Sequence, residues 1–146
     1  MMRSFTYPAK LYPEAKGAFT VLFADVAEAI TSGTDRLDVL EQAADCLEEA
    51  IAGRIARGRE IPPPIQVKRG FEAITLSGWM LAEASLYLAL RESGTSQSEL
   101  ARRLGVDEKQ VRRMLSLRHA TKLTGIEEAL ALLGKRLVVS LESQAG

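Results

Sequence analysis

The stretch ELARRLGVDEKQVRRML, residues 99–115, contains two short amphipathic segments separated by a glycine and a valine. If both segments are helical, their apolar side chains form one inward surface and their charged side chains face outward. Gly105 supplies the positive φ that a sharp turn between two helices needs, and Val106 fills that turn. The apolar positions are Leu100, Ala101, Leu104, Val106, Val111, Met114 and Leu115. The stretch predicts a helix-turn-helix, whose second helix enters the major groove of DNA.

Capping residues flank both of these predicted helices. Ser96 followed by Glu99 forms a capping box, in which the hydroxyl accepts from a free amide and the glutamate reaches back. Asp107 and Gln110 are placed in the same way at the start of the second helix. We therefore expect the first helix to end at Leu104 and the second to begin after Asp107.

The outward side chains of the second helix suit the edges of bases. Lys109 and Arg113 can donate to guanine O6 and N7, and Gln110 can bond adenine with two hydrogen bonds. Glu108 can accept from cytosine N4, or it can complement the positive end of its own helix dipole. The structural alternative for each arginine is an ordinary solvated helix face.

Other polar residues around this stretch suit phosphate groups. Ser96 and Gln97 begin the first helix, where amides and side chains meet phosphate, and the remaining basic residues neutralise charge. The phosphate set is Ser96, Gln97, Arg112, Arg118 and Lys122; the base-reading set is Glu108, Lys109, Gln110 and Arg113. His119 follows in the same basic loop, as a phosphate contact or a plain surface residue.

Charge is balanced overall but divided along the chain. The sequence has 19 basic and 19 acidic residues in 146. Residues 28–52 contain seven acids and one base, whereas residues 95–122 contain seven bases and three acids. A neutral total therefore does not exclude a nucleic-acid partner, and the two ends are expected to have different partners.

The first half of the chain predicts a βββαβ unit. Residues 4–12 and 18–25 alternate as a hairpin about Gly17, and residues 27–33 form a short third strand. Thr34 is the candidate N-cap of a helix over residues 35–57, acidic on its outer face, which Gly58 and the IPPPI stretch end. Residues 65–76 predict a final strand region, interrupted near Gly70. The inward positions of the helix are Leu37, Leu40, Ala43, Ala44, Leu47, Ile51 and Ile55.

The second half predicts further helices and one closing strand. Residues 76–94 predict a helix that Gly94 ends, and we interpret Trp79 and Met80, at the start of the second domain, as packing or inter-domain contacts. A fourth helix of this half runs over residues 124–133, and KRLVVSLE, residues 135–142, alternates as a strand. An unpaired edge strand exposes backbone groups that can pair with another chain, so this strand is the candidate dimer interface. The predicted fold is α+β, with domains at residues 1–75 and 76–146.

Residues 96–115 resemble the Cro/repressor type of helix-turn-helix, and nearly the whole chain resembles the HicB antitoxins of type II toxin-antitoxin systems. The features that carry the likeness are FTYPAKLYPEAKGAFTVLFADVAEAITSG, LDVLEQAADCLEEAI, GREIPPP and ALLGKRLVVSLE, in that order. The resemblance implies an amino-terminal domain similar to a degenerate RNase H fold that binds the HicA ribonuclease toxin and blocks its active site. It also implies a carboxy-terminal domain that forms a homodimer or higher homo-oligomer and binds the palindromic operator of its own promoter.

One segment departs from that family. ADVAEAI, residues 24–30, stands where the family has a proline and a Gly-Cys pair, so only Asp25 and Glu28 are taken as toxin contacts. The acidic helix independently suits a basic partner, because a ribonuclease presents basic residues to phosphates; the alternative is an ordinary solvated helix face. The expected function is an antitoxin and autorepressor. The alternative is a stand-alone transcription regulator whose first domain senses a small ligand.

Enzymatic readings find little support in the sequence. No GxSxG or glycine-rich phosphate loop is present, so we expect no enzyme, no cofactor and no metal. A metal-dependent nuclease would need Glu14, Asp25, Glu28 and Asp35 to converge. Cys46, the single cysteine, lies on the apolar side of its helix and is expected in the core. Without a signal peptide or a long apolar run, a cytoplasmic protein away from membranes is expected.

Overall fold

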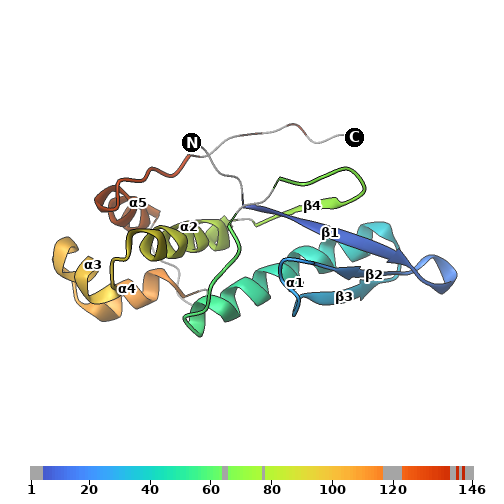
Figure 1. Ribbon diagram of the computed structural model, residues 1–146, viewed down its shortest axis with the longest axis horizontal. Helices are drawn as coiled ribbons and strands as arrows, with labels where there is room; N and C mark the ends of the chain where they lie inside the picture. Colours follow the sequence, from blue (N-terminus) through green and yellow to red (C-terminus); the bar gives the residue numbers. More distant parts are fainter. Residues whose placement is uncertain are drawn as a thin grey trace.

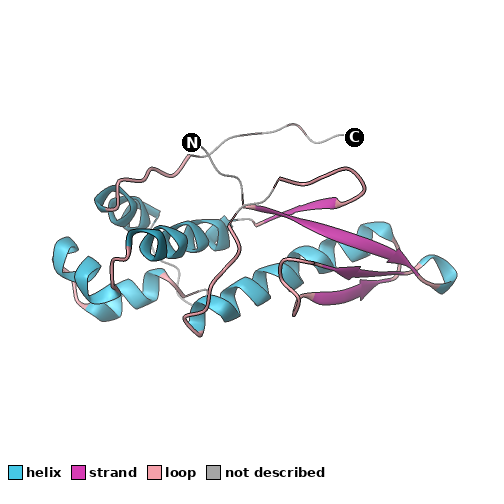
Figure 2. Ribbon diagram, in the orientation of Figure 1, coloured by secondary structure: helices cyan, strands magenta, loops and turns pink. Residues whose placement is uncertain are grey.

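The computed structural model describes residues 5–63, 66–76, 78–116 and 123–138, together with residues 141 and 143 (Figure 1). The amino-terminal half contains β1 (Thr6–Pro13), a short 3-10 turn η1 (Ala15–Gly17), β2 (Phe19–Leu22), β3 (Ile30–Gly33), α1 (Arg36–Ala56) and β4 (Glu72–Thr75). The second half contains α2 (Gly78–Ser93), α3 (Gln97–Leu104), α4 (Glu108–Met114) and α5 (Leu123–Leu132). The sheet with α1 lies at one end of the molecule, and α3, α4 and α5 lie at the other (Figure 2).

The four strands form one antiparallel sheet in the order β3-β2-β1-β4. Tyr7 of β1 lies opposite Ile74 of β4, and Leu11 lies opposite Val21 of β2. Tyr7, Val21 and Ile74 are buried against α1, because alternate residues of a strand point to the same face. The predicted βββαβ order is confirmed.

Helix α1 and its cap each begin one residue later than the sequence predicts. The carboxylate of Asp35, and not the hydroxyl of Thr34, caps the helix by accepting from the amide of Asp38 at 2.8 Å. The amide of Thr34 donates to the side chain of Asp38, and this bond lowers the pKa of the Asp38 carboxyl. Threonine and aspartate are both good cap residues, so residue type alone could not show that Asp35, and not the expected Thr34, is the cap.

The buried face of α1 follows an i, i+4 row. Its fully inward side chains are Val39, Ala43, Leu47, Ile51 and Ile55. Leu40 and Ala44 pack at the margin of this row, but Leu37 is 70% exposed, so its expected inward position was wrong. The row begins at Val39, two residues after Leu37, because Val39 lies against Gly33 of β3.

The later elements follow the predicted order, but two of them differ from the prediction. The predicted strand over residues 65–76 narrows to β4, because Gly70 turns the chain with φ +94°. Residues 135–138 form no strand, so the predicted closing strand is wrong for these residues; residues 139, 140 and 142 of KRLVVSLE lie outside the described part. The alternation of that segment needs a neighbouring strand, and the single chain provides none for the described residues.

One buried apolar cluster extends from Phe5 in the sheet half to Leu130 in α5. Met80 is buried in it, as expected, whereas the Trp79 side chain is 44% exposed. Glu83 of α2 is the one charged side chain that is buried among the described residues, with 3% exposure. No helix in the described part of the chain has the length and apolarity needed to span a bilayer.

Residues 57–63, here called the strap, connect the two halves through backbone carbonyls. The hydroxyl of Tyr87 donates to the carbonyl of Arg59 at 2.7 Å, and the Tyr7 hydroxyl donates to that of Pro62 at 2.8 Å. Arg91 donates to the Gly58 carbonyl at 3.1 Å. Side chains of β1 and α2 therefore hold the same segment in place.

Candidate nucleic-acid interface and acidic helix surface

Helices α3 and α4 are capped and turned as the sequence predicts. The Ser96 hydroxyl accepts from the Glu99 amide at 3.0 Å, and the Asp107 carboxylate accepts from the Gln110 amide at 2.9 Å. Between the helices Gly105 adopts φ +72°, and the Val106 amide bonds back into α3. The return half of the capping box is replaced, because the Glu99 carboxylate pairs with Arg102.

The inward surface of this helix pair is apolar. Leu100, Ala101, Val111, Met114 and Leu115 are buried, while Leu104 and Val106 are half-buried at the edge of the same cluster. Helix α3 contacts both α4 and α5, so the pair is packed on the rest of the second half. The outer surface of α4 is thereby held in a fixed orientation.

The outer surface of α4 is polar and exposed. Its exposed residues are Glu108, Lys109, Gln110, Arg112 and Arg113, the set that the sequence assigned to DNA. The Glu108 carboxylate accepts from the Ser98 hydroxyl at 3.0 Å and lies 3.8 Å from Arg112, so it bridges α3 and α4. These contacts favour the structural role of Glu108 and restrain Arg112 beside it.

Two other members of the predicted interface lie at its margin. Ser96 and Gln97 stand at the amino-terminal end of α3, where Ser96 acts as the cap. Arg118, Lys122 and His119 lie outside the described residues. A groove of about 700 Å³ separates the strap from the turn between α2 and α3, with Glu60, Tyr87, Arg91 and Ser96 among its lining residues.

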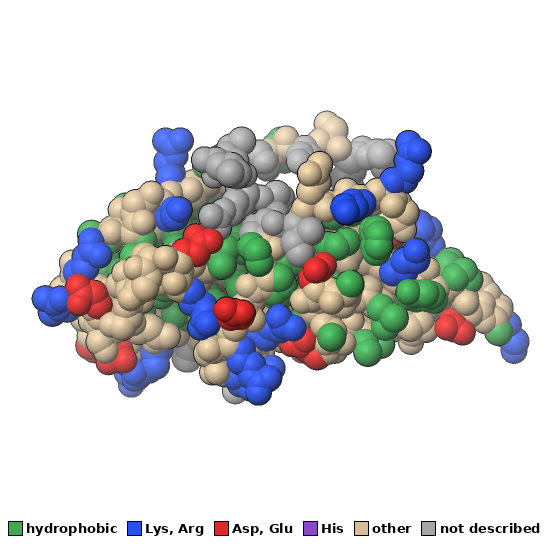
Figure 3. Space-filling model, viewed as in Figure 1, with side chains coloured by type: hydrophobic (Ala, Val, Ile, Leu, Met, Phe, Trp, Pro, Cys, Tyr) green, Lys and Arg blue, Asp and Glu red, His purple; other side chains and the backbone are tan. Residues whose placement is uncertain are grey.

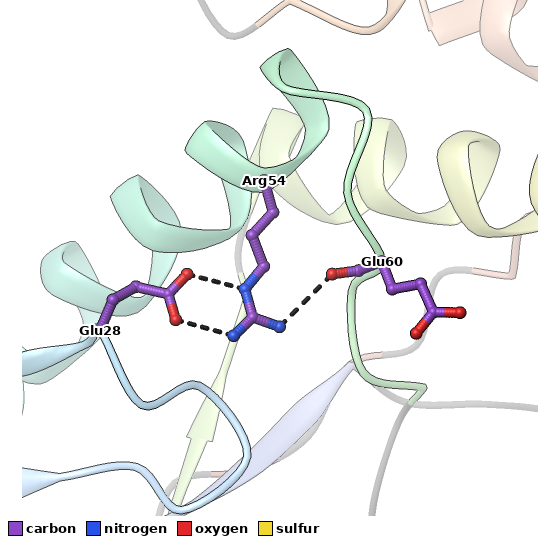
Figure 4. A network of polar contacts seen from close by, with 3 residues as sticks. All are labelled: Glu28, Arg54 and Glu60. Atoms are coloured by element: carbon purple, nitrogen blue, oxygen red, sulfur yellow. Dashed lines mark hydrogen bonds and ion pairs between the residues drawn. The ribbon is translucent and has the colours of Figure 1, made fainter.

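The two acidic residues assigned to a protein partner have different surroundings. Glu28 faces Arg54 of α1 in a two-bond ion pair, with both nitrogen–oxygen distances at 2.7 Å, and Arg54 also donates to the Glu60 carbonyl at 3.4 Å (Figure 4). The hydrogen bonds from Arg54 lower the pKa of Glu28 to about 2. Asp25 is exposed on the loop between β2 and β3. Glu28 therefore holds this loop on α1, a role that the sequence did not suggest.

Helix α1 presents an acidic surface on the side opposite the sheet. Its members, here called the α1 outer face, are Leu37, Glu41, Asp45, Glu48 and Glu49. Glu41, Asp45 and Glu49 are exposed, and Leu37 adds a large apolar side chain at the amino-terminal end. The acidic character was expected, but the exposed leucine was missed because its spacing also fits the core.

Three of the four carboxylates considered for metal binding are engaged in other contacts. Glu14 accepts from the Thr20 hydroxyl at 3.2 Å, Asp35 caps α1 and Glu28 pairs with Arg54. Within the described ranges, no three His, Cys, Asp or Glu side chains gather as a metal site. Cys46 is partly buried near the Ile30 carbonyl, and burial raises the pKa of its thiol.

The sequence is similar to that of known proteins. Residues 6–82 match the model of a family described as the HicB-like antitoxin of bacterial toxin-antitoxin systems. The chain is 32% identical over 142 residues to antitoxin HicB 1 of Photorhabdus laumondii. The matched residues are 97% of this chain and 90% of that protein. It is also 32% identical over 131 residues to antitoxin HicB of Escherichia coli K12, covering 90% of this chain and 95% of the relative.

Proposed function

Because this chain belongs to the HicB-like antitoxin family, we propose that it binds and neutralises a HicA-type ribonuclease toxin and represses its own operon through operator DNA. The observation that carries the proposal is the presence of two chemically opposite surfaces on one chain. The α1 outer face is acidic with an exposed leucine, and the outer surface of α4 carries Lys109, Arg112 and Arg113. We assign these surfaces to residues 1–75 and 76–146, respectively.

The acidic surface suits the toxin. A ribonuclease presents basic groups to RNA phosphates, so an inhibitor that covers them gains association rate and specificity from complementary charge. Leu37, 70% exposed, provides an apolar anchor beside Glu41 on the same helix. Asp25 on the neighbouring loop is a secondary contact, and Glu28 contributes by holding that loop on Arg54. The antitoxin inhibits by binding and catalyses no reaction.

Co-expression with the adjacent toxin gene tests this role. The tagged wild-type chain should retain the toxin through size-exclusion chromatography and suppress its ribonuclease activity. Replacing both Glu41 and Asp45 with Lys should release the toxin, while Glu127→Lys on α5 serves as an exposed charge-reversal control. A wild-type chain that elutes without toxin rejects the antitoxin role, and a double variant that keeps it moves the docking site elsewhere.

The α3–α4 pair suits DNA. In this proposal α4 enters the major groove, where Lys109, Gln110 and Arg113 reach base edges. Ser96, Gln97 and Arg112 would then stand near phosphates, together with Arg118 and Lys122. A palindromic operator requires two copies of the chain, so repression implies a homo-oligomer in the cytoplasm.

The groove between the strap and α2 favours a second candidate function. A volume of about 700 Å³ falls in the range of small-molecule sites, and its walls join both halves. A stand-alone transcription regulator could sense a ligand there. Retention of the toxin during purification favours the antitoxin, whereas DNA binding by a chain that ignores the toxin favours the regulator.

A further inference from the structure

The outer face of the sheet, on the side away from α1, is nearly free of charge. Residues that alternate with the buried Tyr7, Ala9 and Val21 must point to this side. They are Thr6, Pro8, Lys10, Tyr12, Thr20, Leu22, Ile30, Ser32, Ala73 and Thr75, and the strand register places them in neighbouring rows. Among them only Lys10 is charged, in a chain of which 26% of residues are charged.

This face is also apolar and uncovered in the described structure. Ile30 is 59% exposed, Tyr12 is 44% exposed, and Phe71 beside β4 is 39% exposed. Figure 1 shows α1 behind the sheet and no described helix in front of it, and Figure 3 shows hydrophobic side chains gathered over the strands. Exposed aromatic residues with few charges are typical of the centre of a protein interface.

The charges on this face are arranged for pairing with a copy of itself. Lys10 lies over the Phe71 ring at 5.3 Å, and Glu14 lies at the hairpin end, where its carboxylate accepts from Thr20 of the outer face. Tyr12 stands midway between Lys10 and Glu14, which are separated by about 13 Å along the strand direction. A two-fold axis at Tyr12 would bring each Lys10 opposite the Glu14 of the other copy.

We propose that two copies of this chain pack through the outer faces of their sheets, β1 against β1 in opposite directions, with Lys10 of each copy facing Glu14 of the other. Lys10 on the face and Glu14 at its hairpin end are one base and one acid, so the two copies complement each other without presenting net charge to a basic ribonuclease.

The area of the face sets the expected strength of self-association. Four strands of this length cover roughly 20 Å by 20 Å, about half of the 800 Å² that each partner buries in a standard interface. The contact should therefore be reversible and concentration-dependent. It does not depend on the proposed toxin or DNA binding, and it can be measured on the full chain alone.

Charge reversal tests the pairing by analytical ultracentrifugation. Lys10→Glu and Glu14→Lys should each place like charges opposite each other and halve the assembly, whether from dimer to monomer or from tetramer to dimer. An equimolar mixture of the two variants should restore the wild-type assembly, because both facing pairs are then opposite in charge. Glu41→Lys on the far side of α1 is the control and should sediment as wild type.

Four outcomes would overturn the proposal. A wild-type chain that stays monomeric at high micromolar concentration rules out the contact. Assemblies that Lys10→Glu and Glu14→Lys both leave intact place the interface elsewhere. If the mixture fails to restore assembly although both variants fold, as judged by thermal unfolding, Lys10 does not face Glu14. Loss of toxin binding with unchanged self-association assigns the face to the toxin.

Discussion

Glu28 and Arg54 are joined by two parallel hydrogen bonds of 2.7 Å, which fasten the loop between β2 and β3 to the last turn of α1. The same guanidinium reaches the Glu60 carbonyl in the strap. One arginine of α1 therefore contacts both the strap and the loop between β2 and β3, although Glu28 of that loop lies 26 residues away in the chain. Planar two-bond pairs of this kind fix geometry more strongly than a lysine could.

The Glu28 pair predicts a pH-dependent contribution to stability. The pKa of Glu28 falls from 4.5 to about 2 on folding, so the stabilisation is complete above about pH 5 and is lost as pH decreases toward 2. The carboxylate is 42% exposed, and solvent screening limits the contribution to about 1 kcal/mol. Urea unfolding of wild type and Glu28→Gln should differ at pH 7 and converge near pH 2. A constant difference would contradict the pairing.

Glu83 predicts a stability that decreases, and does not increase, as the pH rises. Burial raises its pKa from 4.5 to about 7, so the folded state loses stability as pH rises through this interval. Glu83→Gln should match wild type in pH dependence near pH 4 and gain about 2 to 3 kcal/mol relative to it by pH 8. Urea unfolding at both pH values measures the gain, and an equal gap at the two values would show that Glu83 stays charged without cost.

Gly33 predicts a steric requirement where β3 meets α1. A Cβ at this position would lie 2.4 Å from the Val39 amide nitrogen, which is backbone and cannot move aside. Gly33→Ala should therefore destabilise the chain by about 3 kcal/mol. Gly53→Ala in α1 is the matched control, because its Cβ meets only the flexible Arg57 side chain and should stabilise the helix by up to about 1 kcal/mol.

Lys109 provides the test of base reading. Lys109→Ala should weaken binding to the upstream operator by about 1 to 3 kcal/mol and affect a scrambled duplex less. Arg118→Ala, assigned to phosphate, should weaken binding to both duplexes alike. Fluorescence anisotropy with the two duplexes at fixed salt measures both effects. If the two variants act equally on specific and scrambled DNA, the division into reading and phosphate roles is wrong.

Local signals predicted much of this fold. The hairpin, α1 and the caps at Ser96 and Asp107 follow from residues close in sequence, and the structure has them as expected. Leu37 and Val39 show the limit, because either could begin the apolar row of α1 by spacing. The approach of Val39 to Gly33 decides between them, and that contact exists only in the folded chain.

The contacts around the strap were beyond sequence reasoning for a similar reason. Tyr7 and Tyr87 donate to carbonyls that lie 55 and 28 residues away in the chain. No local pattern encodes such a bond, and a carbonyl acceptor is present at every residue. The ion pair of Glu28 with Arg54, 26 residues apart, was likewise hidden. The exposure of the polar residues on α4 could be predicted, since it follows from helix periodicity alone.

The strap makes each half of the molecule incomplete without the other. Fragments of residues 1–75 and 76–146 would leave the Arg59 carbonyl in one piece and the Tyr87 hydroxyl in the second. They would also divide the shared apolar cluster between the two pieces. When mixed, such fragments should reassemble by complementation. The chain could therefore serve as a split reporter whose signal requires the strap of one fragment to bind α2 of the other.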